Sequence, residues 1–335
     1  MTQVARLNFT LIGAGRIGRI HAGNIARHPQ ARLAYVADAD AHAAQALAEQ
    51  FSAQTIGLDA AVTARDVDAV LIASSTDTHA DYIERCAAAG KPVLCEKPLD
   101  LDAQRASACV QAAAKAGIPL YLGFNRRYDP SFMRLKREIA AGAIGTLETL
   151  HIISRDPSPP PVEYVKRSGG LFRDMMIHDL DMARWLLGAE PIEVFARGSA
   201  LVDAAIGAAG DVDTAMVMLR TSRGQLCQIA NSRRCSFGYD QRIEAFGSQG
   251  MVRADNHTAT SVTVAGANGF NTEPALPFFL ERYADAYRLE LADFINALND
   301  QRVELATGMD GLRALLLADA AQRSLTSGAP VAPGA

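Results

Sequence analysis

The chain has 335 residues, of which 49% are hydrophobic and 21% charged, a composition typical of a globular protein with enough apolar material for two domains. Its formal net charge of −4 provides no basic field and argues against nucleic acid or a membrane surface as a partner. The five cysteines form neither a C-x-x-C pair nor a zinc-ligand spacing, so we expect reduced thiols in a cytoplasmic protein. We also expect no signal peptide and no membrane span, because no apolar run has the required length.

An apolar run over residues 7–12 is followed by a glycine-rich turn and then by a helical pattern. The turn reads G-x-G-x-x-G and contains Gly13, Gly15, Arg16, Ile17 and Gly18. The first glycine allows a tight turn, and the second lets backbone N–H groups approach a pyrophosphate. The third allows close packing of the helix on the strand. This order of strand, turn and helix predicts a dinucleotide site.

A second strand, expected over residues 32–37, ends in Asp38. An acid at this point of a dinucleotide-binding domain accepts hydrogen bonds from the adenosine ribose and repels the 2′-phosphate of NADP. No arginine directly follows Asp38, which favours the same cofactor. We therefore expect NAD rather than NADP. The alternative for Asp38 is a helix-capping role.

Helical and apolar segments continue to alternate, which predicts an α/β fold. We expect helices over 41–50, 81–89 and 101–116 and strands over 67–74, 93–95 and 120–124. This order is typical of a Rossmann domain with a doubly wound parallel sheet, so residues 1–124 are predicted to bind NAD. Ligands of such sheets bind outside the carboxyl ends of the strands. The loop at the end of strand 67–74 is therefore expected to line the cofactor site with Ser74, Thr76 and His79.

The strand over 93–95 is followed directly by Glu96, Lys97 and Pro98. A lysine at this edge of the sheet can reach across the nicotinamide towards a substrate oxygen, and the proline fixes the backbone that aims it. The alternative is a surface lysine that happens to follow a strand. We also hypothesise that the Lys97–Pro98 peptide bond is cis.

From residue 125 the pattern changes, and we expect a C-terminal α+β domain over residues 125–335 with an open, mainly antiparallel sheet. The expected elements are helices over 131–140, 281–299 and 309–326 and strands over 147–154, 193–198, 213–221 and 225–232, the last two as a hairpin. The proline-rich stretch 156–162 is predicted to be an extended loop, either the wall or lid of a pocket or a plain connection. Residues 213–219 are apolar on both faces of their strand, which favours self-association.

A helix predicted over residues 169–187 carries Asp174, His178 and Asp181 on one stripe. An acid one turn from a histidine can hold the imidazole in one tautomer and stabilise its protonated form, as a general base requires. One alternative is a solvated acidic face with a core histidine. Another is a metal site at His178, Asp179 and Asp181. Because adjacent residues point in different directions on a helix, we expect no metal.

Three motifs together resemble the Gfo/Idh/MocA oxidoreductase family: GAGRIG at 13–18, CEKPLD at 95–100 and Asp-x-x-x-His at 174–178. Further stretches that resemble the inositol 2-dehydrogenases of this family are 123–130, 154–161, 168–188 and 237–250. The resemblance implies catalytic roles for Lys97, Asp174 and His178, which also face the substrate, and cofactor contacts from Glu96 and Lys97. It implies further substrate contacts from Arg127, Asp156 and Tyr239, with Tyr283 as a weaker candidate.

The resemblance implies that the chain oxidises one ring hydroxyl of myo-inositol to the ketone scyllo-inosose with NAD⁺. In that reaction His178 removes the hydroxyl proton, Asp174 orients His178, and Lys97 donates to the same oxygen. The alternatives are the same fold acting on scyllo-inositol, a chiro-inositol or an aldose, and an NAD-binding sensor without turnover. The resemblance also implies a homotetramer built through the C-terminal sheet.

Overall fold

The computed structural model describes residues 6–334, which form two compact units. The first unit runs to Tyr128 and includes Ala286–Arg313, and the second consists of Asp129–Asp285 and the chain from Ala314 onward. Each unit has its own six-stranded sheet. The expected change of domain after residue 124 falls close to the observed one. Ala286–Arg313, which lies within the expected domain 125–335, belongs to the first compact unit.

The sheet of the first unit is entirely parallel, which confirms the doubly wound Rossmann arrangement. Its strand order is β3-β2-β1-β4-β5-β6, so the order reverses between β1 and β4. The strands are β1 (Leu7–Ile12), β2 (Ala31–Ala37), β3 (Gln54–Thr55), β4 (Ala69–Ile72), β5 (Val93–Cys95) and β6 (Leu120–Leu122). Strand β4 is shorter than the predicted strand 67–74, because only the central apolar residues of that stretch enter the sheet.

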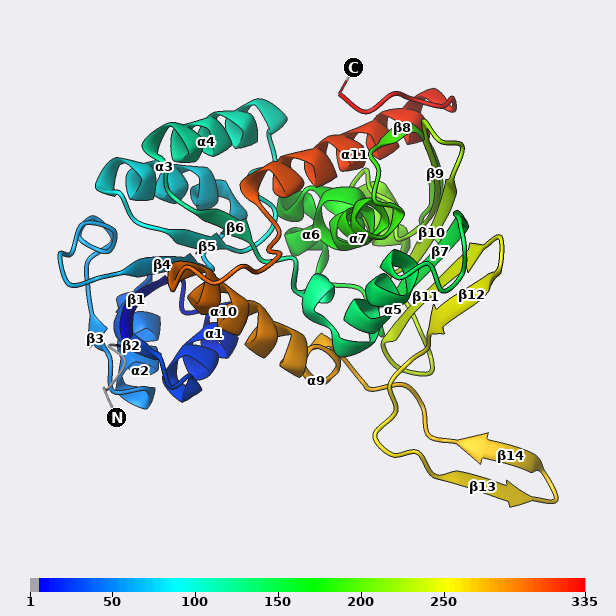
Figure 1. The fold of residues 1–335 in the computed structure, drawn as a ribbon, viewed down its shortest axis with the longest axis horizontal. Coiled ribbons are helices and arrows are strands. Elements are labelled where there is room, and N and C mark those ends of the chain that lie inside the picture. Colours follow the sequence, from blue (N-terminus) through cyan, green and yellow to red (C-terminus); the bar gives the residue numbers. More distant parts are fainter. Residues whose placement is uncertain (1–5, 335) are drawn as a thin grey trace. The chain divides into compact units, whose positions relative to one another are not determined.

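Helices cover both faces of this sheet (Figure 1). They are α1 (Arg16–Arg27), α2 (Ala41–Gln50), α3 (His79–Ala89) and α4 (Ala103–Ala116). Side chains at the helix starts accept backbone N–H bonds, as Asp40 does for α2 and Asp102 for α4. Gly90 and Gly117 end α3 and α4 in the left-handed conformation. These caps explain why the predicted helix limits agree closely with the observed ones.

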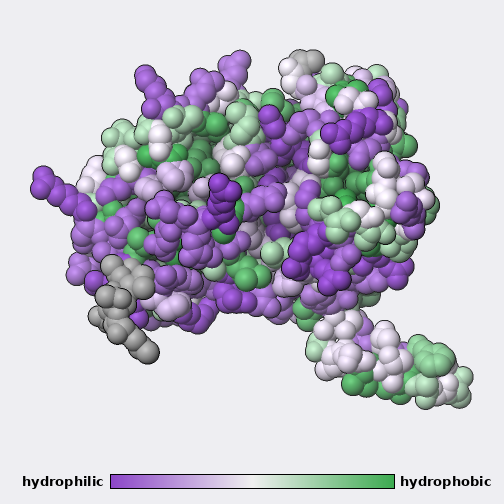
Figure 2. Space-filling view, in the orientation of Figure 1, coloured by the Kyte–Doolittle hydropathy of each residue, from purple (hydrophilic) through white to green (hydrophobic). Residues whose placement is uncertain are grey.

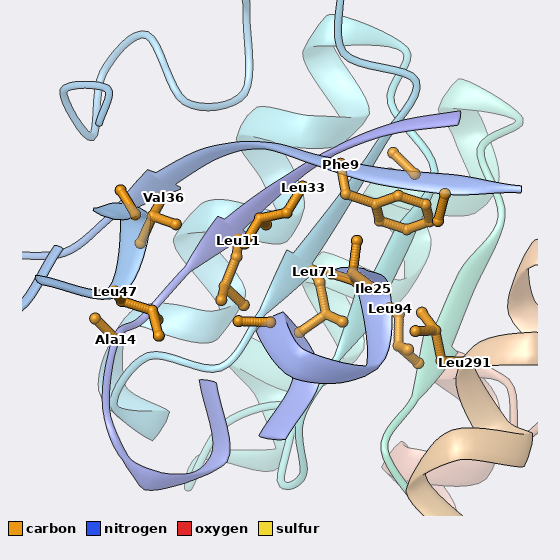
Figure 3. Packing of buried hydrophobic residues seen from close by; sticks show 14 of the residues in the cluster. Phe9, Leu11, Ala14, Ile25, Leu33, Val36, Leu47, Leu71, Leu94 and Leu291 are labelled. Atoms are coloured by element: carbon orange, nitrogen blue, oxygen red, sulfur yellow. The ribbon is translucent and has the colours of Figure 1, made fainter. Parts of the chain in front are cut away.

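Helix α10 (Ala284–Leu298) completes the core of the first unit, although it lies far along the chain. Its residues Leu291, Phe294 and Ile295 are fully buried in the cluster that contains Phe9 and Leu94 (Figure 3). The ring of Phe294 packs edge-on against that of Phe9. The apolar stripe of α10 is therefore satisfied by the first sheet, which is why the first unit is discontinuous in sequence.

The sheet of the second unit has the order β12-β11-β7-β10-β9-β8. Only the β7–β10 pair is parallel, which confirms a mainly antiparallel sheet, and β9 and β10 form the predicted hairpin. The strands are β7 (Leu147–Arg155), β8 (Pro191–Ser199), β9 (Thr214–Thr221), β10 (Leu226–Ser232), β11 (Asp240–Gly247) and β12 (Gly250–Ala254). Strand β9 alternates between buried Val217 and Leu219 and exposed Met216 and Met218, so this sheet has one open face.

The helices of the second unit depart from expectation where the chain approaches Asp174. They are α5 (Pro130–Ala140), α6 (Val162–Ser168), α7 (Ile177–Leu187), α8 (Ala204–Ala208), α9 (Phe279–Arg282) and the end of α11 (Gly308–Ser327). The proline-rich loop ends at Pro161, and Val162 already begins α6, a helix that the sequence did not predict. Residues Phe172–Met176 form a π-helical turn before α7 rather than the expected α-helix. The predicted helix 281–299 is divided into α9 and α10.

A two-stranded arm of the second unit was also not predicted. Strands β13 (Thr263–Gly266) and β14 (Gly269–Thr272) pair with each other and extend away from the rest of this unit (Figure 1). The side chain of Phe270 is 82% exposed, and Val262 and Val264 are also exposed, so the arm carries an apolar surface (Figure 2). A two-stranded hairpin alone is marginally stable in water, which favours a contact with another surface.

All five cysteines are free and buried, as expected from their spacing. Burial raises the pKa of the Cys86 thiol to about 12, so this thiol stays protonated and unreactive at neutral pH. Across residues 6–334 we find no helix with the length and apolarity needed to span a membrane.

Candidate functional site

The glycine turn lies at the carboxyl end of β1, where the three glycines meet different surroundings. A Cβ atom on Gly13 would lie 2.3 Å from the carbonyl oxygen of Ala73, and its φ of +107° also requires glycine. A Cβ on Gly18 would lie 2.0 Å from the carbonyl oxygen of Gly13. A Cβ on Gly15 would meet no atom within 4 Å. The first and third glycines are therefore required by packing, whereas exposed Gly15 leaves open space at the start of α1 that fits a pyrophosphate.

Asp38 lies beside this turn at the end of β2. Its Oδ2 accepts the backbone N–H of Ala14 at 2.6 Å, and its Oδ1 accepts that of Asp40 at 2.8 Å. Asp40, not Asp38, caps α2, so the capping alternative for Asp38 is wrong. The structure thus brings the predicted ribose-binding acid into direct contact with the glycine turn, as an NAD site requires.

The loop after β4 contains Ser74, Thr76 and His79. Ser74 and Thr76 are half-buried, but His79 is buried. The His79 ring nitrogens lie 2.8 Å from the carbonyl oxygen of Pro98 and 3.1 Å from that of Ser74. Burial lowers the pKa of His79, which keeps the imidazole neutral at pH 7. His79 therefore joins two loops at the rim of the first sheet.

Glu96 and Lys97 follow β5 at the same rim. The Lys97–Pro98 peptide bond is cis, which confirms the hypothesis made from the sequence. Lys97 is half-buried, and Glu96 is buried and lies 2.8 Å from Nε2 of His21. The carboxyl ends of β1, β2, β4 and β5 thus gather the predicted cofactor residues, as expected for a doubly wound sheet.

Two groups near Glu96 were missed by the sequence analysis. His21 on α1 pairs with Glu96, and Glu290 on α10 is fully buried. Burial, followed by the negative charge of Glu96, raises the pKa of Glu290 well above its usual value, which favours the protonated carboxyl. No local motif indicates either residue, because Glu290 reaches this region only through the long-range packing of α10.

Arg127 lies in the first unit, on the short 3-10 turn Asn125–Tyr128, and is buried. Its Nη2 is 3.3 Å from Oδ1 of Asp310, near the start of α11. The predicted boundary assigned Arg127 to the C-terminal domain, and the structure corrects this. Its predicted contact with substrate stays a prediction.

In the second unit, Asp174 and His178 are both half-buried. Asp174 lies in the π-helical turn and His178 in the first turn of α7. Oδ1 of Asp174 accepts the hydroxyl of Tyr164 at 3.0 Å, and Oδ2 lies 3.4 Å from Nη2 of Arg233. The Asp174 carboxylate is therefore held from α6 and from the end of β10, by two residues that the sequence analysis did not select.

The two other acids of this helix serve the core. Asp179 is completely buried and accepts hydrogen bonds from Ser154 at 2.5 Å and Asn231 at 2.9 Å. Asp181 is also completely buried and lies 3.7 Å from Arg184. Asp181 therefore does not extend a solvated acidic stripe, and both acids of the alternative metal set are already engaged within the core. Among residues 6–334, no group of three or more histidine, cysteine or acidic side chains is arranged to hold a metal ion.

The remaining predicted substrate residues lie at one end of the second sheet. Arg155, the last residue of β7, pairs with Asp240, the first residue of the antiparallel strand β11. Asp156 follows the first and Tyr239 precedes the second, so both lie at the same end of the sheet. Tyr239 is buried, with its ring edge-on to Tyr283 at 5.9 Å between centroids. The hydroxyl of Tyr283 donates to Gln241 at 3.0 Å. Ser232 of β10 also pairs with Arg155. Arg233, the partner of Asp174, is the next residue and therefore lies at the same end of the sheet.

The parallel sheet, the glycine turn and Asp38 together define an NAD-binding oxidoreductase domain. Residues 7–124 match the family model described as "Oxidoreductase family, NAD-binding Rossmann fold", and residues 132–253 match the "GFO/IDH/MocA C-terminal domain". The chain belongs to the Gfo/Idh/MocA oxidoreductase family.

Relatives of known name resemble almost the whole chain. It is 50% identical to an inositol 2-dehydrogenase of Rhizobium meliloti (strain 1021), over 95% of this chain and 97% of the relative. A myo-inositol dehydrogenase structure from Corynebacterium glutamicum has a TM-score of 0.93 at 45% identity and covers 98% of this chain and 99% of its own. A scyllo-inositol dehydrogenase structure from Lactobacillus casei, with bound NAD(H) and scyllo-inositol, has a TM-score of 0.92 at 30% identity and covers 98% of this chain and 100% of its own.

We predict that Asp38→Ala lowers kcat/KM for NAD⁺ by about tenfold or more and raises the preference for NADP⁺. A hydrogen bond to a charged group contributes about 1.5–3 kcal/mol, and the substitution removes both this bond and the repulsion of a 2′-phosphate. The matched control is Asp40→Ala, which removes the α2 cap at a cost of about 1 kcal/mol in stability and leaves the cofactor preference unchanged. Steady-state kinetics with both cofactors measures this. An unchanged NAD⁺/NADP⁺ ratio in Asp38→Ala would show that Asp38 does not select the cofactor.

Proposed function

We propose that the chain oxidises one ring hydroxyl of myo-inositol to scyllo-inosose with NAD⁺ as the acceptor. The observation that carries this proposal is the arrangement at the end of the second sheet. There an acid held by two partners, Asp174, lies four residues before a half-buried histidine, His178, in a unit that also gathers Asp156 and Tyr239. The names of two similar relatives support inositol as the substrate class.

The chain contains residues suited to each part of this chemistry. When bound, NAD⁺ supplies the acceptor for the C–H hydride. His178 removes the proton of the hydroxyl that becomes the ketone, and Asp174 orients the imidazole and stabilises its positive charge. Lys97 donates a hydrogen bond to the same oxygen, which favours the developing alkoxide. One hydride and one proton thus leave the alcohol, which balances the oxidation.

The residues proposed to hold NAD lie at the carboxyl edge of the first sheet. They are Gly13, Gly15, Arg16, Ile17, Gly18, Asp38, Ser74, Thr76, His79, Glu96 and Lys97. The glycine turn offers backbone N–H groups and the start of α1 to the pyrophosphate. The observation that supports this fit is the open space at Gly15 beside the Asp38–Ala14 hydrogen bond.

A polyol pocket must replace the many hydrogen bonds that the hydroxyls make to water. We propose that Arg127, Asp156 and Tyr239 read the hydroxyls that do not react. A guanidinium donates, a carboxylate accepts and a phenol does both, so this set can distinguish the orientation of neighbouring hydroxyls. The ion pair with Asp310 holds Arg127 in place.

The second candidate substrate is scyllo-inositol, which differs from myo-inositol in the orientation of one hydroxyl. The structure of the Lactobacillus casei relative contains this epimer, but that relative is 30% identical to the chain. The Corynebacterium glutamicum relative named for myo-inositol is 45% identical. We therefore place myo-inositol first.

We predict that His178→Ala and Lys97→Ala each lower kcat by at least ~10²-fold, the contribution of one positioned acid–base group. The matched controls are His42→Ala and Lys115→Ala, which remove an exposed histidine and an exposed lysine and leave kcat unchanged. NADH formation from myo-inositol measures all four variants. Near-normal turnover in His178→Ala and Lys97→Ala would remove the proposed mechanism.

We further propose that the chain is cytoplasmic and forms a homotetramer through the open face of the second sheet. Met216 and Met218 on β9 are 55% and 50% exposed, and Phe246 and Met251 extend the apolar surface over β11 and β12. An exposed sheet face of this kind is typical of an interface. The free, buried cysteines support a reducing compartment.

The double substitution Met216→Glu with Met218→Glu is expected to reduce the molar mass in solution from that of a tetramer to that of a smaller species, because it places charges in an apolar interface. Leu201→Glu is the control, since Leu201 is exposed outside the sheet. Light scattering coupled to gel filtration gives the mass. A tetramer that survives the double substitution would rule out this face as the interface.

A further inference from the structure

Arg233 is a buried cation at the end of β10. The side chain is 1% exposed, whereas its neighbour Arg234 is exposed. The backbone N–H of Arg233 donates to the carbonyl oxygen of Asp213 at 2.8 Å, which fixes the point from which the side chain leaves. A guanidinium stays charged at every working pH, so its burial requires a negative partner.

The contacts of the nearby acids identify this partner. The Asp213 carboxylate accepts backbone N–H groups from residues 201–203 and the hydroxyl of Thr214. The Asp179 carboxylate accepts hydrogen bonds from the side chains of Ser154 and Asn231. Asp174 is the acid that meets the guanidinium, at 3.4 Å between Nη2 and Oδ2. The buried positive charge is thus directed at the carboxylate proposed to orient the general base.

The surrounding core does not use every hydrogen-bond donor of Arg233. Its Nε has no hydrogen-bond acceptor among the described residues. A buried structural arginine normally uses its donors on carbonyl or carboxylate oxygens around it. Here the guanidinium of Arg233 is desolvated and its Nε donor has no acceptor among the described residues, while Nη2 faces Asp174. Because the desolvation cost of a buried ion pair can exceed its Coulombic gain, this contact is weak evidence for a role in stability.

We propose that Arg233 is a positioning residue of the dehydrogenase reaction, which holds Oδ2 of Asp174 so that the carboxylate keeps one orientation beside His178. This inference rests on the proposed function. Asp174 lies in a π-helical turn, a feature frequently found at functional sites. Tyr164, which also contacts Asp174, is exposed on α6, so water competes for that contact. The buried guanidinium supplies the contact that water cannot replace. Arg233 is 1% exposed and its side chain contacts Asp174, so its role is assigned through Asp174.

The test is a double-mutant cycle on kcat with Arg233→Met and Asp174→Asn. Methionine keeps the length and apolar packing of the arginine stem but removes the charge. If Arg233 acts through Asp174, Arg233→Met lowers kcat by ~10-fold or more in the wild-type background. In the Asp174→Asn background the same substitution changes kcat less than about twofold, because the group it positions is already lost. Arg233→Lys, which keeps the charge, recovers part of the activity.

The controls separate positioning from folding. Arg234→Met, at the exposed neighbour, leaves kcat unchanged. The NAD⁺ dissociation constant, measured by fluorescence, stays unchanged in Arg233→Met, because the cofactor residues belong to the other unit. If Arg233→Met does not fold, the cycle is completed with Arg233→Lys, which is expected to show the same loss of effect in the Asp174→Asn background.

The outcomes distinguish this inference from the proposed function. Equal factors in both backgrounds, or an unchanged kcat in Arg233→Met, overturn the positioning role of Arg233 while the dehydrogenase function stands. An unchanged kcat in Asp174→Asn overturns both, since Asp174 then has no role that Arg233 could support.

Discussion

The buried carboxylate of Asp179 is the interaction on which the candidate catalytic region depends. It accepts one hydrogen bond from Ser154 on β7 and one from Asn231 on β10, the only parallel pair in the second sheet as described. A fully buried acid with two donors is costly to move, because both hydrogen bonds to its carboxylate would be lost inside the core. This contact therefore ties the first turn of α7, and with it His178, to the end of the sheet where Arg233 holds Asp174.

Much of the fold follows from local rules that the sequence exposes. Short apolar strands, Asp40 and Asp102 at helix starts, and Gly90 and Gly117 at helix ends predict the alternation of the first unit to within a few residues. Long-range packing was not accessible in this way. Nothing in α10 itself indicates that Phe294 packs on Phe9, and the exposed arm of β13 and β14 carries no alternating pattern strong enough to indicate a strand.

The candidate site shows the same division. The glycine turn, Asp38 and the Lys97–Pro98 pair were found from motifs whose chemistry requires those residue types in that order. The partners that hold them were not found, because His21, Tyr164 and Arg233 reach their acids only in the folded chain. The spacing of Asp174 and His178 suggested a regular helix, but the π-helical turn at Asp174 changes the angular relation that 3.6 residues per turn would give. In this protein, motifs indicate the candidate reacting groups, and tertiary contacts determine how these side chains are held.

The central claim, that the chain is an NAD-dependent polyol dehydrogenase acting on inositol, is tested most directly by NADH formation from NAD⁺ with myo-inositol, scyllo-inositol, a chiro-inositol and a simple aldose. The account predicts the highest kcat/KM with myo-inositol and a loss of that activity in His178→Ala. It is contradicted if no inositol yields NADH, or if the His178→Ala variant forms NADH as fast as the unchanged protein does.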